Sequence, residues 1–155
     1  MDMLYENVLR VSGYHDDIVR FDKRFRKGRK ETEKNYHFEH LYPSPHLNDI
    51  DTLKWRKENW SVVDNFLTDS FSKDTILNSD METYYYFDTP DAAPEELIRH
   101  ISETFNELEF MLVFSPEGNK TGRIQEYLNG ELISYEDLSD EDIAYWFGEP
   151  LEECM

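Results

Sequence analysis

Two amphipathic helices, set between short runs of β-branched and aromatic residues, constrain the fold of this chain most strongly. Residues 15–28 predict the first helix, because Ile18, Phe21 and Phe25 recur at helical spacing and Gly28 suits the C-terminal end. Residues 94–108 predict the second helix, which starts at a proline followed by two glutamates. Its apolar stripe is Leu97, Ile101, Phe105 and Leu108.

The remaining apolar runs have the length and composition of strands. We expect strands over residues 7–12, 35–42, 84–87, 109–114, 123–128 and 131–135. Asn129-Gly130 is a favoured two-residue hairpin turn between the last two strands. Residues 46–83 are interpreted as a mid-chain insertion that contains a helical stripe of Ile50, Leu53, Lys57 and Trp60. A short final helix is expected over residues 140–147, capped by Ser139.

This order predicts an α+β fold in which two helices cover one face of a mainly antiparallel sheet. The 155 residues suit one domain over residues 1–155 and include 23 Phe, Tyr and Trp side chains for a core. Cys154 is the sole cysteine, so neither an intrachain disulfide nor a cysteine-rich zinc site is possible. We expect a soluble, cytoplasmic protein, because no apolar run matches a membrane span or a signal peptide.

Negative charge is concentrated in the second half of the chain. The formal net charge is −18, with +1 in residues 1–60 and −19 in residues 61–155, and residues 131–155 hold nine acids and no base. Such a charge argues against direct contact with nucleic acid or an anionic membrane over most of the surface. The acids confer solubility or, in a sharper hypothesis, imitate a phosphate backbone in front of a basic protein groove.

The acidic extension over residues 136–155 also contains large apolar side chains, which are typical of interface anchors. Ile143, Trp146 and Phe147 equally fit one helical face that closes the open side of the sheet, and both interpretations stay open. If the extension binds a partner, the expected contacts are Glu136, Asp137, Asp140, Glu141, Asp142, Trp146, Glu149, Glu152 and Glu153.

A basic segment supports an alternative function as a small module for RNA or single strands. Six bases lie within residues 23–30, and Phe25 and the aromatic strand offer rings for stacking. The expected contacts are Lys23, Arg24, Arg26, Lys27, Arg29, Lys30, Tyr84 and Tyr86. The plainer interpretation is a helix end whose cations oppose the helix dipole, with Phe25 in the core.

No motif for catalysis or for a cofactor is found with its required context. His37, His40 and His46 are close in sequence, but alternation along a strand would direct the first two to opposite faces, so we expect no metal site. Residues 118–122 (GNKTG) lack the glycine before lysine and the following helix of a phosphate loop. We therefore expect a protein that is not an enzyme and needs no cofactor.

Several local patterns occur together in this chain: ENVLRVSG before a helix, the LYPSP segment, Trp55 with Asn59-Trp60, and an aromatic strand that leads to Thr89 and Pro94. In this combination the chain resembles the YubB-like ferredoxin-like family of small plasmid and phage proteins. The resemblance spans about residues 5–135 and implies a ferredoxin-like fold and a mobile-element origin, but no activity. With the charge pattern, it suggests an acidic inhibitor of a host nucleic-acid-binding protein or defence nuclease, such as an anti-CRISPR protein. A structural subunit of a phage or plasmid assembly is a further alternative.

Overall fold

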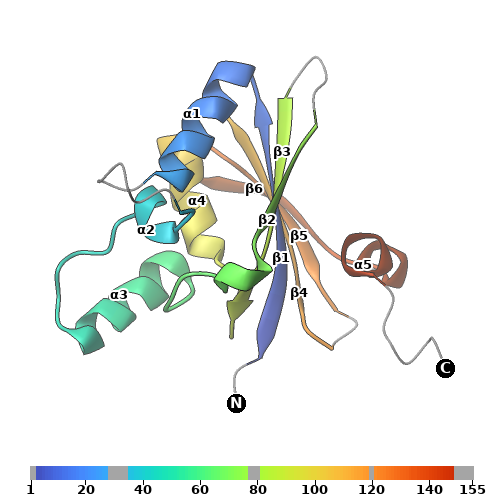
Figure 1. Ribbon diagram of the computed structural model, residues 1–155. Coiled ribbons are helices and arrows are strands. Elements are labelled where there is room, and N and C mark those ends of the chain that lie inside the picture. The colour runs from blue at the N-terminus through green and yellow to red at the C-terminus, as the bar shows by residue number, and fades with distance from the viewer. Residues whose placement is uncertain (1–2, 28–34, 77–80, 119–120, 149–155) are drawn as a thin grey trace.

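A six-stranded antiparallel sheet forms the centre of the molecule, with strand order β2-β3-β1-β4-β5-β6. The computed structural model describes residues 3–27, 35–76, 81–118 and 121–148 (Figure 1). The strands are β1 (Leu4–Gly13), β2 (Ser72–Ile76), β3 (Met81–Pro90), β4 (Glu109–Pro116), β5 (Arg123–Leu128) and β6 (Glu131–Asp137). The helices are α1 (His15–Arg26), α2 (Phe38–Leu41), α3 (Asp49–Trp60), α4 (Glu95–Thr104) and α5 (Asp140–Phe147), with a 3₁₀ turn at Thr68–Ser70.

The elements β1-α1-β2-β3-α4-β4 make a ferredoxin-like unit, in which β1 lies between β3 and β4. The β5–β6 hairpin extends this sheet beyond β4. Figure 1 shows α1, α2, α3 and α4 on one side of the sheet and α5 on the other. The predicted α+β class, the antiparallel sheet and its ferredoxin-like arrangement are therefore confirmed.

Alternation along β1 divides the apolar side chains between the two faces of the sheet. Leu9 and Val11 are buried in the core beneath the helices. Val8 belongs to a smaller cluster with Met111 and Val113, and it pairs directly with Val113 across β4. The sheet consequently has a large core on the helix side and a small apolar patch on the α5 side.

Aromatic rings fill the core beneath α1. Phe21 meets Phe105 and Phe110 at centroid distances of 5.2 and 5.4 Å, and Phe25 meets Tyr85 at 5.3 Å. Phe25 is completely buried, so its expected availability for stacking on a base was wrong and its place in the core stripe is confirmed.

The expected strand over residues 35–42 was wrong. These residues instead contain the short helix α2, which His37 caps by accepting a hydrogen bond from the Glu39 amide. Two residues of α2, Phe38 and Leu41, are buried in the core. The second strand is instead β2, within the expected insertion 46–83. The sequence of β2, SKDTI, has too little apolar alternation to predict an edge strand. Because β2 and the start of β3 lie within residues 46–83, the insertion ends before β2 and does not extend to residue 83.

The helix expected within the insertion is present as α3, but its expected apolar stripe was wrong. Ile50 is 69% exposed and Leu53 is 47% exposed, whereas Trp60 is buried. The Trp60 indole donates to the Tyr42 carbonyl at 3.0 Å, and Arg56 pairs with Glu39 at 2.6 Å. Polar tethers and one tryptophan at its end therefore hold α3, rather than a continuous apolar face.

The later elements follow their sequence signals closely. Asn129 and Gly130 both adopt positive φ, as the expected hairpin turn requires. Ser139 caps α5 by accepting a hydrogen bond from the Asp142 amide at 3.2 Å. The helix α4 begins one residue after Pro94, within the usual variation of helix boundaries. In the described ranges, no helix has the length and apolar character to cross a bilayer.

One carboxylate ties α1 to the edge of the sheet. Asp22 accepts hydrogen bonds from the hydroxyls of Tyr85 at 2.7 Å and Tyr36 at 2.9 Å, and it pairs with Lys73 of β2 at 3.0 Å. Burial and the neighbouring Asp22 charge raise the pKa of both tyrosines, so both hydroxyls stay protonated and donate.

Replacing Asp22 with alanine should leave the Tyr85 hydroxyl buried without its acceptor. We expect Asp22→Ala to lower the free energy of unfolding by about 2–3 kcal/mol, as for other hydrogen bonds to a charged group. Urea unfolding followed by fluorescence measures this change. Asp16→Ala, at an exposed site in the first turn of the same helix, should cost less than about 1 kcal/mol. Equal losses in the two variants would contradict this role for Asp22.

Candidate functional site

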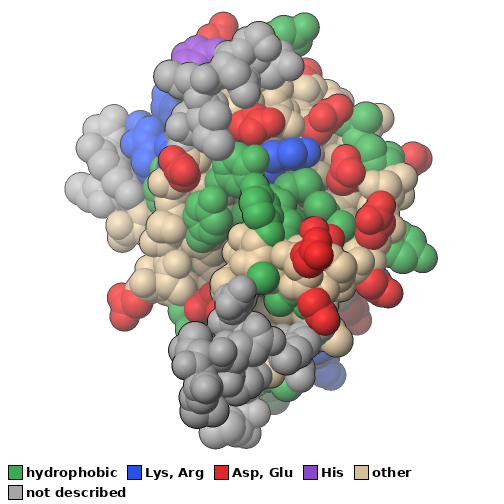
Figure 2. Space-filling view, turned by 90° about the vertical axis from the view of Figure 1, so that its right-hand side faces the viewer, with side chains coloured by type: hydrophobic (Ala, Val, Ile, Leu, Met, Phe, Trp, Pro, Cys, Tyr) green, Lys and Arg blue, Asp and Glu red, His purple; other side chains and the backbone are tan. Residues whose placement is uncertain are grey.

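The face of the sheet opposite α1 and α4, which we call the open face, is the candidate site. Only the eight residues of α5 cover it among the described elements, as Figure 1 shows. Figure 2 looks onto this side and shows apolar side chains at the centre, with many Asp and Glu side chains and a few Lys or Arg side chains around them. The open face thus presents an apolar patch with an acidic rim.

The helix α5 packs two aromatic side chains against this patch. Trp146 and Phe147 lie against the Val8, Met111 and Val113 cluster, and the Trp146 ring is 6.5 Å from Tyr84. Ile143 is buried, so residues 143, 146 and 147 do form the predicted helical face that closes part of the sheet. Trp146 is therefore half-buried against this chain and can offer a partner only part of its surface.

Tyr145 is the aromatic side chain of α5 that points to solvent. It is 78% exposed, and its ring meets Trp146 edge-on at 5.1 Å. It was not among the expected contacts, although its position off the 143/146/147 helical face was a usable signal. Large exposed tyrosines are typical interface anchors.

The expected acidic contacts within the described residues lie on one continuous segment. Glu136 and Asp137 end β6, while Asp140, Glu141 and Asp142 form the first turn of α5, and all five are exposed. Arg123 pairs with Asp137 at 3.5 Å and lies 5.1 Å from the Tyr135 ring. The other expected contacts, Glu149, Glu152 and Glu153, lie outside the described residues, as does Cys154.

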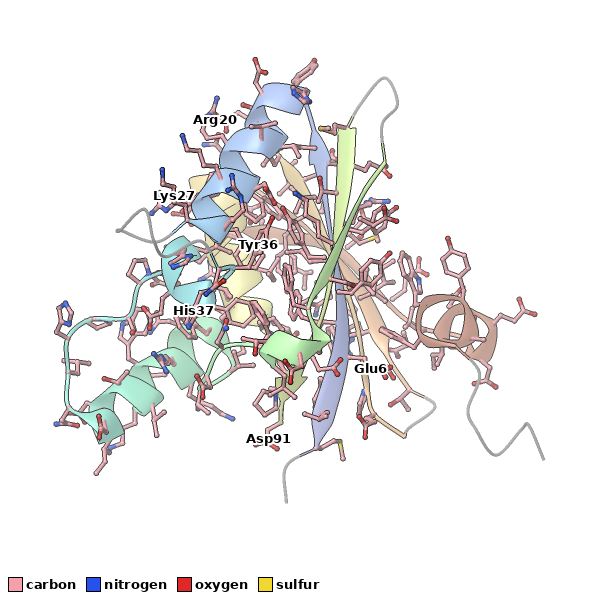
Figure 3. All side chains as sticks on the ribbon, viewed as in Figure 1. Glu6, Arg20, Lys27, Tyr36, His37 and Asp91 are labelled. Atoms are coloured by element: carbon pink, nitrogen blue, oxygen red, sulfur yellow. The ribbon has the colours of Figure 1, made fainter. Side chains whose placement is uncertain are left out.

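A groove of about 230 Å³ runs between α5 and the sheet. Its walls include the apolar side chains Trp146, Phe147 and Tyr86 and the carboxylates Glu6 and Asp88. Figure 3 shows Glu6 on the α5 side of the sheet. The groove therefore combines aromatic surface with negative charge.

The two carboxylates of the groove repel each other. Glu6 and Asp88 are direct cross-strand partners in the β1–β3 pair, a position where like charges destabilise a sheet. Burial, followed by the Asp88 and Glu117 charges, raises the pKa of Glu6. Burial, followed by Glu117, also raises the pKa of Asp88. The raised pKa values mean that ionising either carboxyl group costs more free energy in the folded protein than in the unfolded chain.

A second hollow of about 360 Å³ lies at the other end of the open face. It is lined by the polar and charged side chains Arg10, Ser12, Tyr14, Glu82, Glu107 and Glu109. Tyr14 is 76% exposed there. The positive charge of Arg10 lies among the three glutamates of this hollow and offsets part of their negative charge. This end of the open face is therefore less suited to a basic partner than the end near α5.

The basic residues expected to bind nucleic acid lie on the helix side of the molecule. Lys23, Arg24, Arg26 and Lys27 belong to α1 and its C-cap, and Figure 3 shows Lys27 on the side opposite α5. Arg24 donates to the His40 carbonyl at 2.8 Å, and Arg26 lies 3.7 Å from Asp22.

The structure does not bring this basic segment to the tyrosines expected to assist it. Tyr84 and Tyr86 pack with Val8 and Trp146 on the open face, so the sheet separates them from the cations of α1. Arg29 and Lys30 lie outside the described residues.

The histidines near α2 serve the local structure. The His37 ring accepts the Glu39 amide at 3.0 Å, and the His40 ring lies 2.9 Å from the Phe25 carbonyl. Burial, followed by the charge of His40, lowers the pKa of His37, which suits its role as an acceptor. His46 is exposed, and no group of His, Cys, Asp and Glu in the described part of the chain is arranged to hold a metal ion.

Glu39, in the same segment, is held by specific donors. Burial alone would raise its pKa, but hydrogen bonds from Ser44 and Arg56 outweigh burial and keep the pKa of this carboxyl below its usual range. This carboxylate therefore joins α2 to α3 and is a structural group.

Comparison with known proteins identifies the family. Residues 72–152 match the family model described as the ferredoxin-like domain in Api92-like protein. The chain belongs to this family. Its matched part runs from β2 through the last described helix and so includes the β5–β6 hairpin and α5 of the candidate site.

One solved relative is the crystal structure of a protein api92 from Yersinia pseudotuberculosis. It aligns with 14% identity and a TM-score of 0.46 over 57% of this chain. The alignment spans 30% of that protein's chain, less than a third of its length. No curated protein matches the sequence.

Neutralising one groove carboxylate should relieve the repulsion between Glu6 and Asp88. We expect Glu6→Gln to raise the melting temperature at pH 7, by about 1–3 °C if the relief is a fraction of a kcal/mol. A carboxyl group whose pKa is raised on folding binds its proton more readily in the folded state. The stability of the wild type therefore falls as the pH rises from the pKa of Glu6 in the unfolded chain to its higher pKa in the folded protein.

The advantage of the variant should therefore shrink on acidification, once Glu6 is protonated in the wild type. Differential scanning calorimetry between pH 4 and pH 7 measures this trend. Glu58→Gln, on the exposed surface of α3, is the matched control and should change the melting temperature little. A lower melting temperature for Glu6→Gln at pH 7 would show that the carboxylate stabilises the fold.

Proposed function

We propose that this chain is a non-enzymatic binding protein whose open face occupies a basic, nucleic-acid-binding groove of another protein. The acidic segment of β6 and α5 supplies the charge, and Tyr145 with the neighbouring groove supplies apolar contact. Such a surface favours fast, salt-sensitive association with a basic partner. The protein would act by excluding nucleic acid from that groove.

The like-charged pair in the groove is the observation that carries this proposal. Acids placed only for solubility are well separated on a solvated surface, where their repulsion is screened. Glu6 and Asp88 are instead opposite each other, partly buried and next to Trp146 and Phe147. Charge held at a loss of stability beside apolar surface is typical of a site that a complementary partner completes.

The geometry favours this function over direct binding of RNA or single strands. A stacking platform needs cations along the same face as its aromatic rings. In this chain the rings of Tyr84 and Tyr86 face a surface with an acidic rim, and the described cations of α1 and its C-cap lie beyond the sheet. Arg10 does lie on the same face as the rings, but it shares its hollow with Glu82, Glu107 and Glu109. The open face is therefore better suited to binding a basic protein than to binding RNA or single strands directly.

The biological setting of the proposal comes from the resemblance of the sequence to YubB-like plasmid and phage proteins. We infer that the chain is a cytoplasmic accessory of a mobile element and that it inhibits a host nucleic-acid-binding protein or defence nuclease, as an anti-CRISPR protein does. A role as a structural subunit of such an element would use the same surface without inhibition.

Reversing the charge of the first turn of α5 should weaken this binding strongly. Nuclease-treated bacterial lysate is loaded on DNA-cellulose, and the protein is added as a soluble competitor. We expect it to release a basic protein as a complex, and we expect the combined variant Asp140→Lys, Glu141→Lys and Asp142→Lys to be roughly tenfold or more less effective.

The control variant carries the same change in charge on α3. Asp49→Lys, Asp51→Lys and Glu58→Lys alter two first-turn acids and one later acid, all exposed, and should leave the release unchanged. Tryptophan fluorescence checks that Trp146 remains packed in the first variant. Equal release by both variants, or release that does not weaken with salt, would contradict the proposed function.

A further inference from the structure

The two edges of the sheet are protected to very different degrees. At one edge, Lys73 of β2 is engaged with Asp22 and Tyr36, and a charged lysine is a common guard of an edge strand. At the other edge, all seven residues of β6 are exposed. Among the strands that the structure describes, β6 has one neighbour, β5. Half of its backbone N–H and C=O groups therefore face away from the sheet.

The free edge of β6 has apolar side chains at its centre. Leu132, Ile133 and Tyr135 are 43%, 53% and 60% exposed. A register shift opposite Glu126 and Tyr127 inserts one residue into this strand. Exposed, β-branched and aromatic side chains on an unpaired edge suit the addition of another strand.

The charges at both ends of β6 determine which strand can be added. Glu131 begins the strand, and Glu136 and Asp137 end it. In an antiparallel pair of two copies of this chain, Glu131 of each copy would lie near the acidic end of the other, and in a parallel pair each acid would lie beside itself. Like charges across a strand pair are destabilising, so a second copy is a poor occupant.

We propose that β6 pairs with an extended segment of the basic partner, in which β-branched residues lie between Lys or Arg residues. The backbone of the segment would continue the sheet as a seventh strand, and its cations would meet Glu131 and Glu136. This inference rests on the proposed function, because it names how the partner engages the acidic surface. It adds backbone pairing to the electrostatic attraction.

A short peptide tests the pairing directly. The probe is the fluorescein-labelled peptide Lys-Thr-Val-Thr-Val-Thr-Lys, titrated into the full chain by fluorescence anisotropy. Its comparison peptide has the same sequence with N-methyl groups on alternate residues, which keep the charge and remove backbone donors. We expect the N-methylated peptide to bind roughly tenfold or more weakly, since two or more hydrogen bonds are lost.

Amide hydrogen exchange locates the bound peptide. We expect slower exchange in residues 131–137 when the peptide is present, and unchanged exchange in β2. Protection confined to α5 or to β3 would overturn the assignment of the site to β6. Equal affinity of the two peptides, or no binding of either, would overturn strand addition.

Charge variants separate a failure of this inference from a failure of the proposed function. Glu131→Lys with Glu136→Lys should weaken the unmodified peptide strongly, whereas Glu58→Lys should not. Binding that depends on these acids but is insensitive to N-methylation would overturn strand addition and leave the acidic docking surface intact. Binding that depends on N-methylation but not on the acids would contradict the proposed function and the selection of a basic strand by the charges of β6.

Discussion

A sheet has two faces, and this chain places nearly all its helices on one of them. Alternate residues of β1 must face opposite sides, so Leu9 and Val11 enter the large aromatic core while Val8 faces the other way. The two-turn helix α5 supplies Trp146 and Phe147 for a small part of that second face. The groove, the acidic rim and the exposed Tyr145 all arise from this unequal coverage.

The charged groups on the two sides of the sheet also differ in the partners that they have. On the helix side, two carboxylates near the core have several partners: Asp22 has two tyrosine hydroxyls and Lys73, and Glu39 has Ser44 and Arg56. On the open face, Glu6 is opposite Asp88 instead. Asp22 and Glu39 thus have donors that suit a structural role, whereas Glu6 and Asp88 are opposite a like charge in the groove where we propose that a partner binds.

The sequence predicted the elements whose signals are local. The spacing of Ile18, Phe21 and Phe25 defined α1, and Asn129-Gly130 defined the last hairpin. It failed at residues 35–42, where Phe38 and Leu41 are buried at the three-residue spacing of a capped helical turn, and at β2, whose pairing with β3 depends on distant residues. The grouping of Glu6 with Asp88 could not be read from the sequence, because only the strand register places residues 82 apart in opposition.

The central claim is that the open face, and not another exposed apolar surface, contacts a basic nucleic-acid-binding protein. Site-specific photo-crosslinking in cells tests it most directly, with benzoylphenylalanine in place of Tyr145 and, as a comparison, in place of Ile50 on α3, which is similarly exposed. The account predicts one dominant adduct from position 145, with a protein that binds DNA or RNA, and no such adduct from position 50. The same adduct from both positions, or an adduct from position 50 alone, would contradict it.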